Sequence, residues 1–222
     1  MLRTSAICNN KQLTILRFVS FVFFLIMLFA FCFTGYIATH HQPLQFDTII
    51  FLWLQSIRSS FMTSCVIVIT FFGSRYFLFP CYTLLVIYYV FFRKKLWVGI
   101  AIALIGFLGN ELLYLMQDVY QRIRPSNPLI TGVTGYGYPS GHSLASFVFA
   151  GLMSFIIWQK HFQTKKKLTF TILLFFYATM IALSRSYLRV HYPSDVLGGF
   201  FLAMSWLIPC LWILYFVNKK YH

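Results

Sequence analysis

The chain has 222 residues, of which 59% are hydrophobic, 21% are aromatic and only 10% are charged. A soluble domain carries about 25% charged residues, and a chain of this length has too little interior to hide so much apolar surface from water. The composition therefore excludes a soluble globular protein, a disordered tail and a secreted disulfide scaffold. The formal net charge of +14 would suggest nucleic-acid binding in a soluble protein. Here the basic residues lie in short clusters between apolar runs, which is typical of an integral membrane protein that does not bind nucleic acid.

Six apolar segments are long enough to cross a bilayer, whose hydrocarbon core of about 30 Å is spanned by about 20 helical residues. They are residues 18–38, 76–92, 96–116, 143–158, 168–183 and 196–217. The first has a basic flank, as a signal peptide does, but its apolar run is too long and no convincing cleavage site follows it. We therefore expect a retained first helix and an all-α, six-span membrane protein that forms a single domain over residues 1–222.

Residues 46–72 fit this pattern less well. The stretch 46–57 is apolar but is interrupted by Asp47 and other polar residues, and the stretch 61–72 is apolar but short and ends at Gly73. We expect an interfacial helix followed by a partly inserted segment, both on the outer face. A seventh span is the alternative, and it would place the basic residues at the N-terminus on the opposite side from the other basic clusters.

The basic clusters predict which side of the membrane each loop occupies. With six spans, the N-terminus lies on the same side as three clusters: Arg93, Lys94 and Lys95; Lys160 with residues 165–167; and Lys219 with Lys220. The four acidic residues, Asp47, Glu111, Asp118 and Asp195, lie in the outer half or outside. Because positive loops stay in the cytoplasm, we expect both termini to be cytoplasmic.

Polar residues that apolar packing does not explain gather at three outer edges of the predicted spans. The residues after the third span include Gln117, Asp118, Arg122 and Arg124. The fourth span is preceded by Tyr138, Pro139, Ser140, Gly141 and His142. The connection between the fifth and sixth spans contains Ser184, Arg185, Arg189, His191 and Asp195. Polar groups close to hydrocarbon are costly, so we interpret them as functional. Three loops that are distant in sequence but lie at one face can form one site.

Two features of these edges suit a bound phosphate. Arg124, Arg185 and Arg189 carry permanently charged guanidinium forks, which pair with phosphate oxygens through two hydrogen bonds. Ser140 and Gly141 lie where a helix begins, and free backbone N–H groups there favour an anion. Taken singly, the arginines could instead bind lipid headgroups, and the Ser-Gly pair could be only a turn and a cap.

The histidines add the groups that chemistry on a phosphate requires. His142 and His191 offer a nucleophile and a proton donor. Asp195 follows His191 by four residues, so on a helical turn its carboxylate can hold one ring nitrogen and direct the other. A single histidine in a loop is usually only solvated, but the convergence of these groups on one edge predicts a site that handles phosphate.

The spacing of these residues resembles the type 2 phosphatidic acid phosphatase superfamily, whose three motifs are KxxxxxxRP, PSGH and SRxxxxxHxxxD. The second motif is complete from Pro139 to His142, and the third is complete as Ser184 and Arg185, five residues, His191, three residues and Asp195. The first motif ends correctly in Arg124 and Pro125, while Gln117 stands in the place of its lysine. The resemblance covers residues 61–217, and the small chain is similar to the compact bacterial phosphatases that act on undecaprenyl pyrophosphate or phosphatidylglycerophosphate.

The resemblance implies a two-step displacement at the outer surface of a bacterial-type plasma membrane. His191 attacks the phosphorus and becomes a phosphohistidine, which Asp195 orients and stabilises. His142 protonates the leaving lipid oxygen and then activates the water that releases phosphate. The equatorial oxygens are held by Arg124, Arg185, Ser140 and the Gly141 N–H, with help from Gln117. No metal or other cofactor is expected, because the arginines supply the charge that Mg²⁺ supplies elsewhere.

The departure at Gln117 leaves its role open. On a continuous helix Gln117 lies about 10 Å from Arg124 along the same face, where it can donate a hydrogen bond to a phosphate but brings no charge. Arg122 could supply that charge. However, Asp118 and Arg122 are four residues apart, and we expect them to pair with each other.

Two other functions are compatible with the sequence. On the same scaffold, a lipid-to-lipid phosphotransferase would pass the phosphoryl group from His191 to another lipid. A non-catalytic phospholipid binding or transport protein would use a degraded site, but the presence of both histidines and Asp195 argues against it, since passive binding needs no oriented nucleophile. Undecaprenyl pyrophosphate, phosphatidylglycerophosphate, phosphatidic acid and lipid A phosphates all present a terminal phosphate at the interface, so the sequence leaves the lipid open.

Overall fold

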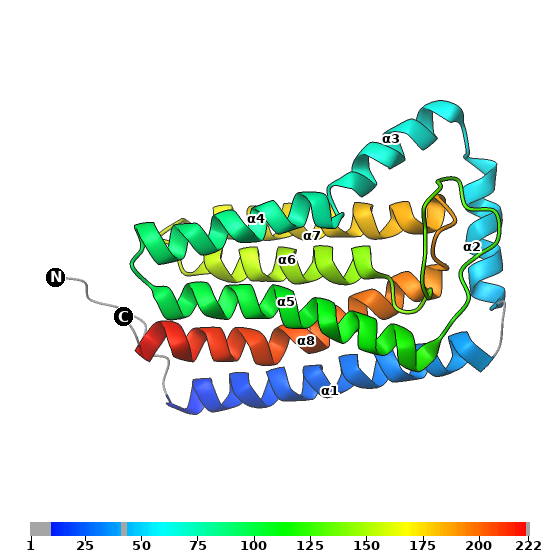
Figure 1. The fold of residues 1–222 in the computed structure, drawn as a ribbon. Coiled ribbons are helices and arrows are strands. Elements are labelled where there is room, and N and C mark those ends of the chain that lie inside the picture. The colour runs from blue at the N-terminus through cyan, green and yellow to red at the C-terminus, as the bar shows by residue number, and fades with distance from the viewer. Residues whose placement is uncertain (1–9, 41–43, 221–222) are drawn as a thin grey trace.

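The chain forms a bundle of helices in a computed structural model that describes residues 10–40 and 44–220. Over these residues the helices are α1 (Asn10–His40), α2 (Gln45–Ser56), α3 (Ser60–Phe71), α4 (Arg75–Ile87), α5 (Leu96–Tyr120), α6 (Gly141–Trp158), α7 (Thr164–Tyr187) and α8 (Pro193–Lys220). A short π-helical segment, η1 (Tyr88–Phe92), extends α4. Long helices run side by side, while α2 lies across one end of the bundle (Figure 1).

Six helical stretches within the described residues are long and apolar enough to cross a membrane, which confirms the predicted all-α, six-span architecture. They are Gln12–His40, Ser60–Phe92, Leu96–Tyr120, Gly141–Trp158, Thr164–Tyr187 and Pro193–Lys220. Several of these stretches extend beyond the predicted spans. Hydropathy marks only the part of a helix that suits hydrocarbon, whereas backbone hydrogen bonding continues into the polar ends.

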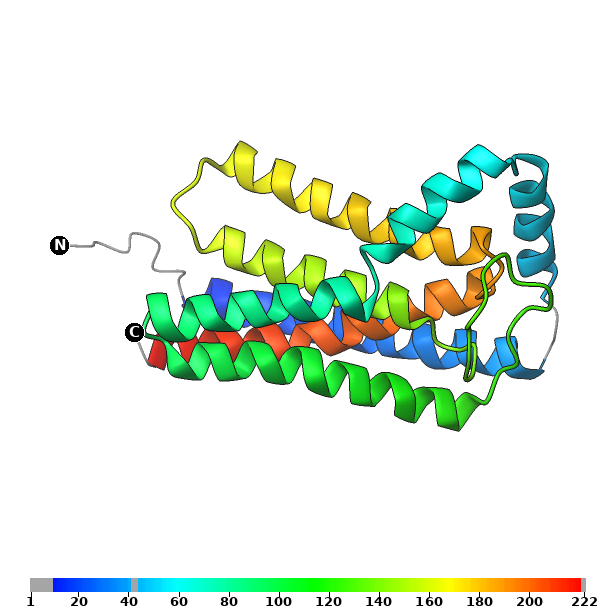
Figure 2. The ribbon, with the colours of Figure 1, turned by 45° about the horizontal axis from the view of Figure 1, so that its top comes forward.

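The second stretch contains a break between α3 and α4. Here α3 turns away from the bundle, and α4 continues along it (Figures 1 and 2). Ser59 caps α3 by accepting a hydrogen bond from the backbone N–H of Met62 at 3.1 Å. A methyl group added at Gly73, in the break, would lie 2.2 Å from Cγ2 of Ile181 on α7. A glycine is therefore needed for α7 to pack this closely against the break.

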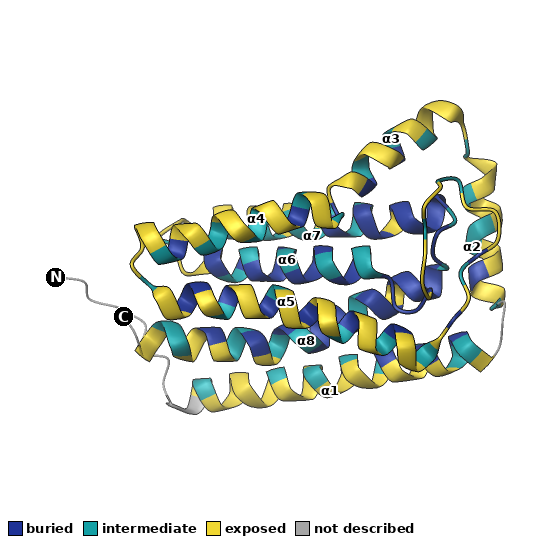
Figure 3. Ribbon diagram, in the orientation of Figure 1, coloured by how far each residue is buried: buried dark blue, intermediate teal, exposed yellow. Residues whose placement is uncertain are grey.

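The interior of the bundle is centred on α6. In its most apolar 18-residue window 56% of the residues are buried, against 6% for α1. Figure 3 shows that buried residues concentrate along α6 and around the adjoining ends of α7 and α8. Small residues allow this close packing: a methyl group added at Gly151 would lie 2.4 Å from Leu207 on α8. The exposed apolar side chains of α1 face outward from the bundle, as contact with lipid requires.

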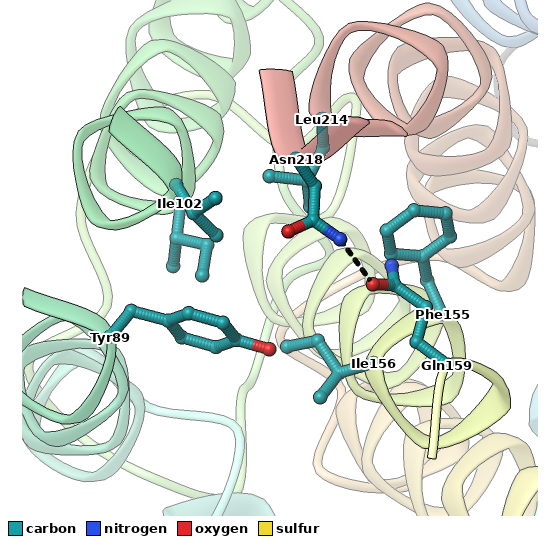
Figure 4. Close-up of a pocket in the computed structure, with 8 residues that line it drawn as sticks. Tyr89, Ile102, Phe155, Ile156, Gln159, Leu214 and Asn218 are labelled. Atoms are coloured by element: carbon teal, nitrogen blue, oxygen red, sulfur yellow. Dashed lines mark hydrogen bonds between the residues drawn. The ribbon is translucent and has the colours of Figure 1, made fainter. Parts of the chain in front are cut away.

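The two ends of the bundle differ. At one end α1 begins and α8 ends, while α2, residues 121–140 and the turn between α7 and α8 lie at the other (Figures 1 and 2). A small cavity near the first end is lined by residues of η1, α5, α6 and α8: Tyr89, Val98, Ile102, Phe155, Ile156, Gln159, Leu214 and Asn218 (Figure 4). Asn218 closes it by donating to Gln159 at 2.7 Å and accepting from Lys95 at 2.8 Å. All the predicted site residues lie outside this cavity.

Candidate active site

The three predicted edges meet at the second end of the bundle, around His191. The ring of His191 is 3% exposed, and it lies in the turn between α7 and α8. Its Nε2 atom is 2.9 Å from a terminal nitrogen of Arg124, and its Nδ1 atom is 2.8 Å from the carbonyl oxygen of Gly137. Both partners come from the connection between α5 and α6. This connection therefore wraps around the histidine and contacts both of its nitrogens.

These two contacts determine which nitrogen of His191 carries the proton. A guanidinium group can only donate hydrogen bonds, so Nε2 accepts from Arg124 and Nδ1 donates to the Gly137 carbonyl. Asp195, the predicted orienting carboxylate, lies 3.6 Å from Nδ1, which is longer than a hydrogen bond. The direct partner of Nδ1 is thus the Gly137 carbonyl, with Asp195 beside it. The lone pair of the ring therefore lies on Nε2, the nitrogen that faces Arg124.

The surroundings keep His191 neutral. Burial lowers the pKa of His191 to about 4, with Asp195 raising it and Arg124 lowering it. A neutral imidazole is the form that can attack phosphorus. Burial also lowers the pKa of Arg124, although the negative charge of Asp195 opposes this. Arginine has an ordinary pKa far above neutrality, so Arg124 still presents a positive charge to Nε2.

Arg124 is held in place by the backbone on both sides of the site. Its Nε atom donates to the carbonyl of Gly135 at 2.9 Å, and a terminal nitrogen donates to the carbonyl of Val190 at 3.0 Å. The predicted phosphate ligand Arg189 lies elsewhere, since its guanidinium carbon sits 5.4 Å from the centre of the Phe51 ring on α2. Arg124 is therefore the arginine of this end that contacts Nε2 of His191.

Several buried donors at this end of the bundle have no protein partner within the described residues. Two of them belong to the predicted phosphate ligands: Nε of Arg185, near the end of α7, and the hydroxyl of Ser140, the residue before α6. Arg185 uses a terminal nitrogen to bind Thr70 of α3 at 2.7 Å, and the Ser140 N–H donates to the carbonyl of Asp195 at 3.0 Å. A buried polar group without a partner costs about 1–3 kcal/mol. That both residues hold a substrate phosphate stays a prediction.

The second predicted motif is packed tightly at the start of α6. A methyl group added at Gly141 would lie 2.8 Å from Leu113 on α5, and one added at Gly73 would lie 3.3 Å from Cδ2 of His142. His142 therefore sits in the first turn of α6, against the break between α3 and α4. The N–H groups of this turn and the positive end of the helix dipole point out of the same helix end.

Gln117 contacts the second motif rather than an open space. Its side chain is buried on α5 and donates from Nε2 to the carbonyl of Pro139 at 3.1 Å. Pro139 immediately precedes Ser140, so this hydrogen bond braces the backbone from which the predicted phosphate ligands extend. A direct contact between Gln117 and phosphate stays a prediction.

The predicted pairing of Arg122 with Asp118 is wrong. Helix α5 ends at Tyr120, and Gln121 takes a left-handed backbone conformation with φ of 45°, so Arg122 does not lie one helical turn beyond Asp118. Arg122 instead turns inward and is 1% exposed. It forms salt bridges with Asp47 of α2 and with Asp195. Asp118 remains exposed. Asp47 was not predicted to lie at the site. Its carboxylate in an otherwise apolar helix was a sequence feature that could have indicated a role there.

Comparison with known proteins places the chain in a family. The family model of the PAP2 superfamily matches residues 94–220. The chain belongs to the PAP2 superfamily. Phosphatidylglycerophosphatase B of Bacillus subtilis is 30% identical to this PAP2 protein over 149 residues, which cover 67% of this chain and 73% of the relative. An undecaprenyl-diphosphatase of Sulfolobus acidocaldarius is 27% identical over 173 residues, which cover 75% and 77% of the two chains.

Solved structures share the fold of this PAP2 protein. A crystal structure of the transmembrane PAP2-type phosphatidylglycerolphosphate phosphatase from Bacillus subtilis superimposes with a TM-score of 0.74 at 25% identity, covering 93% of this chain and 97% of that one. The structure of Aquifex aeolicus LpxE gives a TM-score of 0.59 at 20% identity, covering 79% and 98%, and shows likeness of fold alone. The family predicted from the three motifs is thus confirmed.

Proposed function

We propose that this chain is a membrane lipid phosphatase that releases the terminal phosphate of a lipid phosphate or pyrophosphate through a phosphohistidine at His191. The observation that carries the proposal is the neutral, buried His191, whose Nε2 lone pair faces Arg124. The buried, unpaired donors of Arg185 and Ser140 lie near it. Membership of the PAP2 superfamily and relatives named for phosphatidylglycerophosphate and undecaprenyl diphosphate support such a substrate.

The proposed reaction begins when the substrate phosphate reaches Nε2. Arg124 exchanges its hydrogen bond with Nε2 for one with a phosphoryl oxygen, and the released lone pair attacks phosphorus. The bond from Nε2 to phosphorus forms while the bond from phosphorus to the lipid oxygen breaks, and His142 gives that oxygen its proton. Arg185, Ser140 and the N-terminus of α6 stabilise the charge on the equatorial oxygens.

The second step restores the enzyme. His142, now neutral, removes a proton from a water molecule, whose oxygen attacks phosphorus as the bond to Nε2 breaks. Inorganic phosphate leaves, and His191 regains its hydrogen bond with Arg124. Throughout both steps the Gly137 carbonyl keeps the proton on Nδ1, so the same nitrogen always faces the substrate.

The proposed substrates and chemistry can be tested with purified protein in detergent. Phosphate release is measured on undecaprenyl pyrophosphate, phosphatidylglycerophosphate, phosphatidic acid and a lipid A phosphate, each alone and with EDTA. We expect release from at least one lipid in the presence of EDTA and none by His191→Ala. Release of inorganic phosphate from a single purified lipid would show hydrolysis rather than transfer of the phosphoryl group to a second lipid. Complete inhibition by EDTA would refute a metal-independent reaction, and no release from any lipid would leave the binding or transport function.

We further propose that the site faces the outer, periplasmic side of the plasma membrane and that both termini are cytoplasmic. The support is charge: basic clusters border the helix ends opposite the site, and such clusters remain in the cytoplasm. A thiol reagent that cannot cross membranes should label Ser126→Cys, in the exposed connection at the site, in intact cells. It should not label Lys166→Cys at the start of α7. Labelling of Lys166→Cys alone would show that the orientation is the reverse of the one proposed. The parent protein is the control, because any labelling of it comes from the native cysteines.

A further inference from the structure

Helix α2 carries a buried carboxylate toward the site. The helix lies across the end of the bundle (Figure 1), and its apolar residues Ile49, Leu52 and Trp53 are 66%, 62% and 61% exposed. Asp47, on the same short helix, is 0% exposed. A carboxylate is expensive to bury unless it is paired and hydrogen-bonded. The position of Asp47 therefore depends on the groups that it contacts.

Asp47 has three hydrogen bonds, all with residues that adjoin the site. Its Oδ2 atom accepts from Arg122 at 2.8 Å and from the hydroxyl of Ser194 at 2.7 Å. Its Oδ1 atom accepts from the backbone N–H of Ser194 at 2.8 Å. Ser194 lies in the first turn of α8 and immediately precedes Asp195. Asp47 thus anchors the helix start that carries the carboxylate of the third motif.

Arg122 extends these contacts to both neighbours of the His191 Nδ1 atom. Its side chain binds Asp195 and the hydroxyl of Ser194. Its backbone carbonyl accepts from the N–H of Gly137 at 2.7 Å, and the Gly137 carbonyl in turn accepts from His191. Movement of Arg122 would therefore displace both groups that face Nδ1. Asp47 and Ser194 hold Arg122 on the other side, together with the ring of Tyr192, whose centre lies 4.3 Å from the guanidinium carbon.

The charges of this network suit a phosphohistidine. Asp47, Arg122 and Asp195 together carry two negative charges and one positive charge, all in side chains that are 0% exposed. When Nε2 of His191 bonds to phosphorus while Nδ1 keeps its proton, the imidazole ring gains a positive charge. A net negative charge next to the Nδ1 side stabilises that ring.

We propose that Asp47 and Arg122 are positioning residues that act on His191 through Asp195 and Gly137, so that α2 completes the catalytic site from outside the three motifs. This inference rests on the proposed phosphohistidine reaction. Neither residue contacts the ring of His191 itself. Their effect is therefore expected in the rate of phosphoryl transfer rather than in substrate binding.

The test compares Asp47→Asn with Asp118→Asn, an exposed carboxylate on α5, in detergent with the lipid that the parent enzyme hydrolyses. We expect Asp47→Asn to lower kcat at least tenfold, with KM within about threefold of the parent, and to slow formation of the alkali-stable phosphoenzyme equally. Asp118→Asn should leave both constants unchanged. A kcat for Asp47→Asn within twofold of the parent would overturn the proposal.

A double-mutant cycle separates positioning from a general loss of stability. In the Asp195→Asn background, measured under single-turnover conditions, adding Asp47→Asn should cause a clearly smaller fold-loss than in the parent, because its route to His191 through Asp195 is already cut and only the route through Gly137 remains. An equal fold-loss in both backgrounds would overturn the proposal. If Asp47→Asn does not purify as a folded protein, Ser194→Ala replaces it in the cycle. This change removes only the bridging hydroxyl, and we expect about a threefold loss in the parent and a smaller loss with Asp195→Asn. Failure of the parent to release phosphate would instead refute the proposed function.

Discussion

Replacement of Gln117 tests whether this side chain braces the second motif or binds the substrate. Gln117→Leu has nearly the same volume but removes the donor to the Pro139 carbonyl, which lies 3.1 Å away in a buried position. A buried carbonyl left without its partner costs about 1–3 kcal/mol. The backbone before Ser140 would relax to recover part of that energy. We therefore expect kcat/KM to fall about tenfold, equivalent to about 1.4 kcal/mol.

The measurement is kcat/KM for a lipid monophosphate and a lipid pyrophosphate side by side, because a brace acts on both alike. Gln117→Lys is the matched variant, since its ammonium group can still donate to Pro139. We expect its kcat/KM to stay within about threefold of the parent on both lipids. A tenfold gain by Gln117→Lys would show that residue 117 faces the phosphate. Full activity of Gln117→Leu would refute the bracing role.

Three further changes have defined outcomes. Because burial lowers the pKa of His191 to about 4, the ring stays neutral well below pH 6.5. On the acid side kcat/KM should therefore fall as the pH drops through about 4, and an acid-side loss centred near pH 6.5 would contradict this. Gly199→Ala places a methyl group 2.6 Å from the backbone oxygen of Ser140, and this overpacking should reduce kcat/KM about tenfold. An unchanged kcat/KM would mean that α8 shifts to accommodate the methyl group without disturbing the site. Tyr138→Phe removes the hydrogen bond that the Tyr138 hydroxyl donates to the carbonyl of Phe31 at 2.6 Å. This should lower the free energy of unfolding by about 1 kcal/mol and the Tm in detergent by about 2–4 °C. An equal or higher Tm would show that this hydrogen bond does not stabilise the fold.

The sequence was sufficient to predict the spans because the hydropathy of a segment indicates directly whether that segment lies in lipid or in water. It also predicted that residues near Arg124, Ser140 and His191 would meet, because three polar edges that lie at the same face of the bundle and avoid hydrocarbon are expected to lie close together. This success depends on features that belong to single segments. A run of apolar residues or a motif at a helix end can be recognised without knowing its neighbours.

Contacts between segments were harder to predict. The Gly137 carbonyl that holds His191 has no sequence signature, because every residue carries the same group. The pairing of Asp118 with Arg122 assumed that the helix continues to residue 122, whereas it ends at Tyr120. The actual partners of Arg122, Asp47 and Asp195, are 75 and 73 residues away, so only the folded arrangement of the helices reveals them.

The network of Asp47, Arg122 and Asp195 also bears on how the protein is made. These residues are separated by 75 and 73 positions in the chain, and ribosomal synthesis delivers them in that order. Until α8 is inserted, Asp47 lacks both bonds from Ser194, and an ion pair without its further hydrogen bonds is weakly held. We expect α2 to stay loosely attached at the membrane surface during this interval. A nascent chain that has not reached His191 therefore carries the proposed phosphate-binding groups without the proposed nucleophile or a seated α2. We expect such a chain to act on the surrounding lipids only when its last helix is in place.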